Sequence, residues 1–195
     1  KLAMITLQRR TVLIYLASAA IAAPRVAAAG NTGEHAFPVV IDHAFGSTKV
    51  ATKPQRIVTL GWNGEDAGLS LGMKPIAMTR YGSFPTGIFP WNEELIGAAT
   101  PQLLSGALDF EAIAALRPDL ILSVYSGISK PEWRRLSTIA PPVVYRSGPW
   151  AADWRAVIMQ SGLALGVPYQ AEPLLLCSVA FSRTHGANHS VLTAM

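Results

Sequence analysis

The chain has 195 residues, of which half are hydrophobic and only 14% are charged, so it can bury a sizeable core and is not a disordered chain. Its sixteen basic residues outnumber its twelve acidic ones, but four of the basic residues lie within residues 1–29, which contain no acid. The remainder holds twelve of each sign, and this balance argues against a nucleic-acid-binding protein. Cys177 is the single cysteine, which excludes an internal disulfide and a cysteine zinc cluster.

Residues 1–29 have the pattern of a secretory signal peptide. Arg9 and Arg10 precede a run of 13 uncharged residues (11–23), which is too short to span a membrane comfortably, and small residues stand before Gly30. The arginine pair also fits a twin-arginine export signal, so both export routes stay open. We therefore expect a periplasmic protein. The alternative is that this segment remains as an uncleaved amphipathic anchor.

Residues 37–51 alternate weakly between apolar and polar side chains around Gly46 and Ser47, which predicts a β-hairpin. After the hairpin, short apolar runs with the character of buried strands alternate with segments of helical periodicity. We predict strands over residues 57–60, 75–78, 102–104, 120–124 and 143–145, helices over residues 63–72, 109–117, 129–140 and 150–165, and a structured loop over residues 80–91.

Side chains at the predicted helix starts support this assignment. Asp109 can accept hydrogen bonds from the exposed amides of the first helical turn, and Ser129 with Glu132 forms a capping box. Asn63, with Asp66 three residues later, gives a similar signal. Strands that alternate with helices predict an α/β fold, in which a Rossmann-like lobe has a central parallel sheet with helices on both faces.

Three segments, in this order, carry a resemblance to a known family. The family is that of the periplasmic binding proteins for ferric siderophores, haem and cobalamin. Its entry to the first core strand resembles residues 53–60 (KPQRIVTL), and its helix-to-strand turn resembles residues 71–77 (LGMKPIA). Its E-x-I-x-x-L-x-P-D-L-I signature resembles residues 110–122 (FEAIAALRPDLIL). The resemblance covers residues 37 to 176. It implies a monomeric substrate-binding component of an ABC importer that uses no cofactor and delivers a ferric siderophore to a membrane permease.

The resemblance also implies a division of the chain. An export signal over residues 1–29 is followed by the N-terminal α/β lobe over residues 37–168 and by the start of an inter-lobe helix over residues 169–176. Residues 177–195 contain neither Asp nor Glu and show no sustained helical period, and no second lobe follows. We interpret this tail as the out-of-frame product of a truncated or frameshifted gene.

Ligands of open α/β sheets bind at the carboxyl ends of the strands. Aromatic side chains and an occasional arginine follow the predicted strands, and they suit a large, flat, negatively charged ferric chelate, because rings give apolar contact and a guanidinium pairs with ligand oxygens. The alternative for each aromatic residue is packing beneath a loop. The candidate ligand-binding residues are Trp62, Arg80, Tyr81, Trp91, Tyr125 and Trp150.

Two further site residues follow from the resemblance. The family carries a ligand-binding arginine in the loop before the helix of residues 109–117, but residues 104–108 contain none, which argues against a hydroxamate and leaves Arg80 as the alternative cation. Family members dock on the permease through an acidic residue of each lobe, and Glu132 is the candidate here. Its place in a capping box offers a purely structural alternative.

Two other functions compete with binding. A small secreted α/β hydrolase-like or metal-dependent enzyme needs a nucleophile–base pair or three convergent ligands, and the ordered region offers only His35 and His43. His185 and His189 have the spacing of a metal pair, but Gly186 lies between them in the aberrant tail, so we expect no metal site and no catalytic residue. The third possibility is a non-functional gene fragment.

Overall fold

The computed structural model describes residues 37–168, 170, 171 and 173. The predictions for residues 1–29 and 177–195, and for most of the inter-lobe helix at 169–176, lie outside the described residues. In chain order the elements are β1 (Val39–His43), β2 (Gly46–Val50), β3 (Ile57–Thr59), α1 (Asp66–Ser70), β4 (Ala77–Thr79), α2 (Pro90–Ile96), β5 (Gln102–Leu104), α3 (Phe110–Ala115), β6 (Leu120–Ser123), α4 (Lys130–Leu136), β7 (Pro142–Val144) and α5 (Trp154–Leu165).

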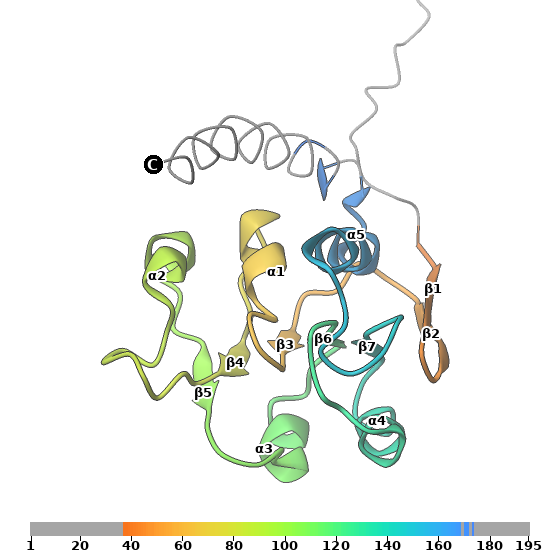
Figure 1. Cartoon of the computed structure of the whole chain (residues 1–195), viewed down its shortest axis with the longest axis horizontal. Helices are drawn as coiled ribbons and strands as arrows, with labels where there is room; N and C mark the ends of the chain where they lie inside the picture. Colours follow the sequence, from red (N-terminus) through yellow and green to blue (C-terminus); the bar gives the residue numbers. More distant parts are fainter. Residues whose placement is uncertain (1–36, 169, 172, 174–195) are drawn as a thin grey trace, which may run out of the picture. The chain divides into compact units, whose positions relative to one another are not determined.

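A five-stranded parallel sheet lies at the centre of the lobe, in the order β5-β4-β3-β6-β7. Helices α1, α2 and α5 cover one face, and α3 and α4 cover the other (Figure 1). The antiparallel hairpin of β1 and β2 lies beside the β7 edge (Figure 1). The predicted α/β lobe with a Rossmann-like parallel sheet is therefore confirmed.

The core consists of two apolar layers, because alternate side chains of each strand point to opposite faces of the sheet. Ile57 and Leu122 pack with α5 and the hairpin, whereas Val58 and Ile121 pack with α3 and α4. All four residues of β6 are buried, which explains why this strand is a continuous apolar run in the sequence.

Within the described residues, no helix is both long and apolar enough to cross a bilayer.

Two helices begin later than the sequence predicts. α1 starts at Asp66, because Asn63 has a positive φ of 53°, which lies outside the helical region, and does not cap the helix. α5 starts at Trp154 rather than Trp150, because the backbone of Trp150 has a positive φ of 55°. Asp153 caps α5, and its carboxylate accepts a hydrogen bond of 2.9 Å from the backbone N–H of Ala156.

Helix α2 is absent from the sequence prediction. Its buried residues are Asn92 and Ile96, so its inner face carries a polar side chain and shows no apolar period. Pro90 occupies its first turn, where the missing N–H costs nothing. The hairpin was predicted with its turn at Gly46 and Ser47, but the turn lies two residues earlier, at 44–45, because Gly46 pairs with His43.

Candidate functional site

The order of the strands places the candidate site at the carboxyl ends of β3 and β6. The chain leaves β3 toward β4 and β5 on one side, and returns to β6 and β7 on the other, so these two neighbours form a topological switch point. The loops that follow them are joined by a hydrogen bond of 3.0 Å from the Trp62 N–H to the Tyr125 carbonyl. Trp62 and Tyr125 thus lie together, as the sequence predicts.

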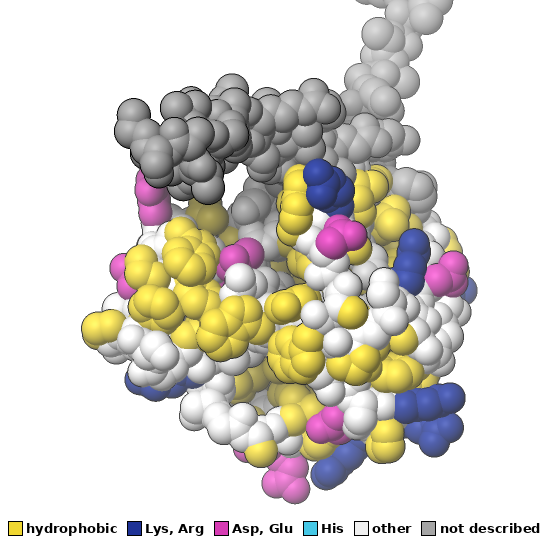
Figure 2. All heavy atoms as spheres, viewed as in Figure 1, with side chains coloured by type: hydrophobic (Ala, Val, Ile, Leu, Met, Phe, Trp, Pro, Cys, Tyr) yellow, Lys and Arg dark blue, Asp and Glu magenta, His cyan; other side chains and the backbone are white. Residues whose placement is uncertain are grey.

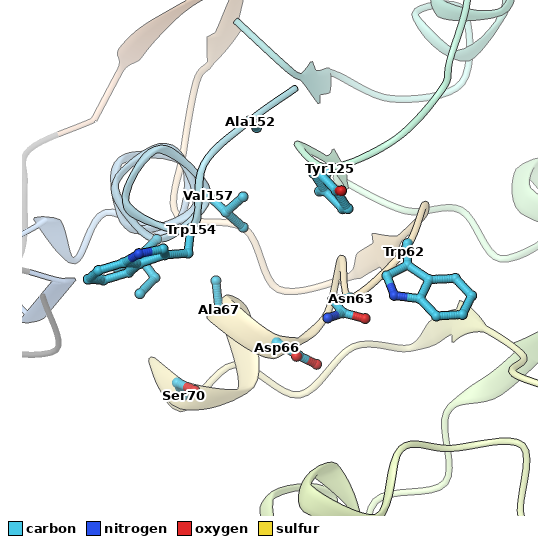
Figure 3. Close-up of a pocket in the computed structure, with 10 residues that line it drawn as sticks. Trp62, Asn63, Asp66, Ala67, Ser70, Tyr125, Ala152, Trp154 and Val157 are labelled. Atoms are coloured by element: carbon cyan, nitrogen blue, oxygen red, sulfur yellow. The ribbon is translucent and has the colours of Figure 1, made fainter. Parts of the chain in front are cut away.

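One cleft, the α1–α5 cleft, has a volume of about 460 Å³ and lies between α1 and α5. In Figure 3, Trp154 and Val157 of α5 face Ala67 and Ser70 of α1 across this cleft. The residues that line it are Trp62, Asn63, Asp66, Ala67, Ser70, Tyr125, Ala152, Trp154, Val157 and Ile158.

A second cleft, the strand-tip cleft, lies at the ends of the central strands and has a volume of about 430 Å³. Trp62 lines both clefts, so its indole stands between them. The residues that line the strand-tip cleft are Leu60, Gly61, Trp62, Thr79, Leu104, Gly106, Leu108, Ser126, Gly127, Ile128, Glu132 and Trp150.

Three of the predicted ligand-binding residues form an open aromatic group. Trp62 and Trp150 are each 52% exposed, and the rings of Tyr125 and Trp150 meet edge to face at 5.6 Å. Large aromatic side chains are seldom left in water without a reason, so this group is the strongest candidate for a ligand contact in the lobe. Trp154, which lines the α1–α5 cleft and is 38% exposed, was not among the candidate ligand-binding residues, because it lies within the helix predicted over residues 150–165 and not after a strand.

Tyr81 lies beneath Trp62 and is only 4% exposed. Its ring packs 4.0 Å from that of Phe89 and meets the Trp62 ring edge to face at 5.4 Å. Its hydroxyl accepts a hydrogen bond of 3.0 Å from the Asn63 N–H and donates one of 2.9 Å to the Glu65 carboxylate. Burial beside that carboxylate raises the pKa of Tyr81, so the phenol keeps its proton at neutral pH.

Arg80 and Trp91 line neither cleft. Arg80 is exposed, and the stem of its side chain lies against Gly87. Trp91 is also exposed; its ring stacks on Phe89 at 4.5 Å, and its indole N–H donates a hydrogen bond of 3.2 Å to Asp66. Both residues therefore lie outside the α1–α5 cleft and the strand-tip cleft.

The charged groups at the site are carboxylates that the sequence interpretation did not assign to it. Glu65 is completely buried, and this desolvation raises its pKa to about 7. Asp66 lines the α1–α5 cleft, and burial raises its pKa as well. The sequence signal was the pair of adjacent acids that follows a strand end, but Asp66 was interpreted only as a helix-capping residue.

Hydrophobic side chains gather on the face shown in Figure 2, and most Lys and Arg side chains lie toward its margins. Neither the α1–α5 cleft nor the strand-tip cleft has a Lys, Arg or His in its lining. The acids of these linings are Asp66 in the first and Glu132 in the second. This side of the site therefore offers aromatic and acidic groups to a ligand.

Glu132 caps helix α4. Its carboxylate accepts hydrogen bonds of 2.7 Å from the Ser129 N–H and 2.6 Å from the Ser129 hydroxyl, and these two bonds lower its pKa. The predicted capping box is thus confirmed. The second role predicted for Glu132, docking on a permease, stays a prediction.

His43, the residue on which an enzymatic function would depend, lies away from both clefts. It is buried, and it contacts the rings of Phe45 and Trp133 edge to face. Among residues 37–168, 170, 171 and 173, no cluster of three His, Cys, Asp or Glu side chains could hold a metal ion. The histidine pair at 185 and 189 lies outside the described residues.

Comparisons with known proteins agree with this geometry. A family model described as periplasmic binding protein matches residues 93–175. The iron uptake ABC transporter substrate-binding protein PiaA of Streptococcus pneumoniae is 35% identical, with a TM-score of 0.69 over 78% of this chain and 53% of PiaA. A periplasmic solute binding protein of Mycobacterium smegmatis is 31% identical, with a TM-score of 0.73 over 78% of this chain and 55% of that protein.

A more distant relative is SirA of Staphylococcus aureus, solved in complex with staphyloferrin B. It is 28% identical, with a TM-score of 0.63 over 80% of this chain and 53% of SirA. The chain thus spans about half the length of the solved structures it matches. The comparison with curated protein sequences gives no match.

The sheet, its switch point and these matches define an α/β lobe of a binding protein. Residues 93–175 match the periplasmic binding protein family, so the resemblance that the sequence motifs predict is confirmed. This is a family of binding proteins and not of enzymes, so the alternative of a secreted hydrolase-like enzyme is wrong. The family also implies a location outside the cytoplasm.

Proposed function

We propose that this lobe forms one wall of the binding site for a ferric siderophore in the substrate-binding component of an ABC importer. Relatives support the ligand class, since PiaA was also solved in complex with ferrichrome and SirA with staphyloferrin B. The observation that carries the proposal is the open aromatic group of Trp62, Tyr125 and Trp150 at the switch point of the sheet.

Aromatic rings suit this task for a physical reason. A ferric siderophore is a bulky chelate with a largely organic surface, and flat, stiff side chains contact such a surface at a small cost in conformational entropy. A ligand that rests on one wall alone stays open to water on its other side. We therefore expect the described lobe to bind such a chelate less tightly than the relatives, which are about twice as long.

Delivery to a membrane permease belongs to the same proposal, with Glu132 as the candidate docking residue. Its carboxylate is engaged by Ser129, so a permease would have to contact the remaining lone pairs or replace that capping bond. Export through the twin-arginine route, which rests on Arg9 and Arg10, is likewise a proposal.

The direct test is isothermal titration calorimetry of the full chain with ferrichrome, a neutral ferric trihydroxamate. We expect saturable binding, and we expect the affinity to fall at least about fivefold in Trp62→Ala, because truncating a central aromatic contact typically costs more than about 1 kcal/mol. This expectation is opposite to the one drawn from the missing arginine at 104–108, and the titration decides between them: saturable binding would show that a hydroxamate binds without that arginine.

Val40→Ala is the matched control, because Val40 is another exposed hydrophobic residue, 64% exposed, but lies on the hairpin outside both clefts. It should bind ferrichrome as the wild type does. The same titration is made with the ferric complex of staphyloferrin B, a polycarboxylate chelate. Failure of the wild-type chain to bind either chelate would refute the proposed function.

A further inference from the structure

The turn that carries Trp62 rests on a buried polar pair. Asn63, the next residue, has a φ of 53°, a conformation that costs free energy for a residue other than glycine. Its backbone N–H donates to the Tyr81 hydroxyl at 3.0 Å, and this hydroxyl donates to Glu65 Oε2 at 2.9 Å. The same hydroxyl lies 3.3 Å from the Gly61 carbonyl, so its shorter bond to Glu65 links the strained turn to a buried carboxylate.

The same carboxylate is linked to helix α2. The side-chain amide of Asn92 donates to Asp66 Oδ1 at 2.6 Å and approaches Glu65 Oε1 at 3.3 Å, and the Trp91 indole donates to Asp66 Oδ2 at 3.2 Å. The start of α1 and a continuous later segment, the 80–89 loop with the start of α2, thus meet in one hydrogen-bonded network.

The position of the Tyr81 ring determines what lies under Trp62. Phe89 packs against Tyr81 at 4.0 Å and against Trp62 at 5.7 Å, so the three rings form one block. A shift of the Tyr81 hydroxyl would tilt this block and move the Trp62 indole, which stands between the two clefts. The buried network thus reaches the exposed aromatic wall through direct ring contacts.

A carboxylate at this position lowers the stability of the folded state. Glu65 is fully buried, and its hydrogen-bond donors are the neutral groups of Tyr81 and Asn92. A buried carboxylate without a cation costs more than a neutral side chain of the same size. Packing of α1 does not require a carboxylate at residue 65. We therefore look for its role in positioning the side chains that it contacts, Tyr81 and Asn92.

We propose that Glu65 and Tyr81 are positioning residues for the ligand wall, and that the hydrogen bond between them holds the Trp62 indole in its binding orientation. The expected effect on the affinity for a chelate rests on the proposed function. The geometry itself, from Glu65 through Tyr81 to Trp62, does not depend on the identity of the ligand.

The strength of the hydrogen bond between Tyr81 and Glu65 depends on pH. The titratable groups that face Glu65 are Tyr81 from the loop and Asp66 from α1, while α2 contributes the neutral amide of Asn92. Tyr81 keeps its proton, so Glu65 is the group that changes charge near neutral pH, where its pKa is about 7. Above this pH the bond from Tyr81 is charge-assisted; below it the bond becomes a weaker, neutral one.

The first experiment measures ferrichrome affinity by calorimetry at pH 6 and pH 8, since the charge of this chelate does not change over that range. We expect wild-type protein to bind at least about threefold more weakly at pH 6. Glu65→Gln should bind equally at both pH values, and Tyr81→Phe should bind more weakly than wild type at pH 8. Glu94→Gln, at an exposed glutamate of α2, should keep the wild-type profile.

The second experiment needs no ligand. In protein labelled with 5-fluorotryptophan, the ¹⁹F resonance of Trp62 is assigned by its loss in Trp62→Phe, and its chemical shift is followed from pH 5.5 to 8.5. We expect a titration with a midpoint near 7 that is present in Glu94→Gln and absent in Glu65→Gln. If Glu65→Gln fails to fold, the same comparison is made with Tyr81→Phe, which retains the ring.

The two readouts separate this inference from the proposed function. A Trp62 resonance that titrates with Glu65 in a protein that binds no chelate supports the positioning role and refutes the proposed function. Chelate binding that is unchanged by Glu65→Gln and by Tyr81→Phe at both pH values, with a Trp62 resonance that does not titrate, overturns the positioning role and leaves the proposed function intact.

Discussion

The imidazole of His43 is held in one protonation state by its neighbours. The Thr48 hydroxyl donates to the Pro142 carbonyl at 2.7 Å, so toward His43 Nε2, 2.9 Å away, it can only accept. His43 Nδ1 accepts a hydrogen bond of 3.2 Å from the Phe45 N–H. The ring is therefore neutral, with its proton on Nε2. Desolvation by burial lowers its pKa, against a smaller opposing effect of Asp42.

This neutral state predicts a pH dependence of stability. The pKa of His43 is lower in the folded protein than in the unfolded chain, so the folded state binds fewer protons and stability is lost as the pH falls below about 6.5. Urea unfolding at pH 5 and pH 7.5 measures the effect. The loss on acidification should be smaller in His43→Gln, which cannot titrate; an equal loss in both proteins would contradict this account.

At the residue scale, the sequence predicts which side chains follow the strands but not how deep they lie. Trp62 and Tyr81 are both aromatic and both follow a core strand, yet one is 52% exposed and the other 4%. The difference arises from Phe89, which packs on Tyr81 from a loop whose path has no periodic signal. Glu65 was missed because its partners lie 16 and 27 positions away in the chain.

At the scale of elements, the ends of β3 and β6 approach closely at Gly61. Its φ is 94°, and a Cβ atom at this position would overlap the Tyr125 carbonyl oxygen and lie 2.8 Å from Ser126 Cβ. Only glycine fits here, because a side chain would both strain the backbone and push apart the two loops that carry Trp62 and Tyr125.

Gly61→Ala should therefore lower the free energy of unfolding by about 2 to 4 kcal/mol, which combines backbone strain with overpacking. Gly106→Ala is the matched control, since Gly106 has a similar φ of 80° but nothing within 4 Å of its added Cβ. It should cost only about 1 kcal/mol. Denaturant unfolding compares the two, and equal losses would show that the contact between the loops is unimportant.

Elements with a strong local signal were predicted well. The Asp109 carboxylate accepts bonds of 3.0 Å from the N–H groups of Glu111 and Ala112 and caps α3 as expected. Helix α2 was not predictable in the same way, since Asn92 occupies its inner face to meet Glu65 and Asp66. A polar network that serves tertiary packing removes the apolar period on which sequence reasoning depends.

At the scale of the whole described lobe, topology determines where a ligand can bind. Parallel strands place all their carboxyl ends on one edge, and the reversal of strand order between β3 and β6 opens that edge. The location of the candidate site was therefore predictable from the alternation of strands and helices. Its two clefts were not, because their walls include α5 residues and loops whose positions depend on tertiary packing.

The most direct test of the ligand wall is ¹⁹F NMR of the 5-fluorotryptophan-labelled chain, which has five tryptophans, with the diamagnetic gallium complex of ferrichrome added. Our account predicts that the resonances of Trp62 and Trp150 shift, while that of Trp133, which packs on His43 and Phe45 outside both clefts, does not. Calorimetric binding with Trp62 and Trp150 unshifted would contradict it.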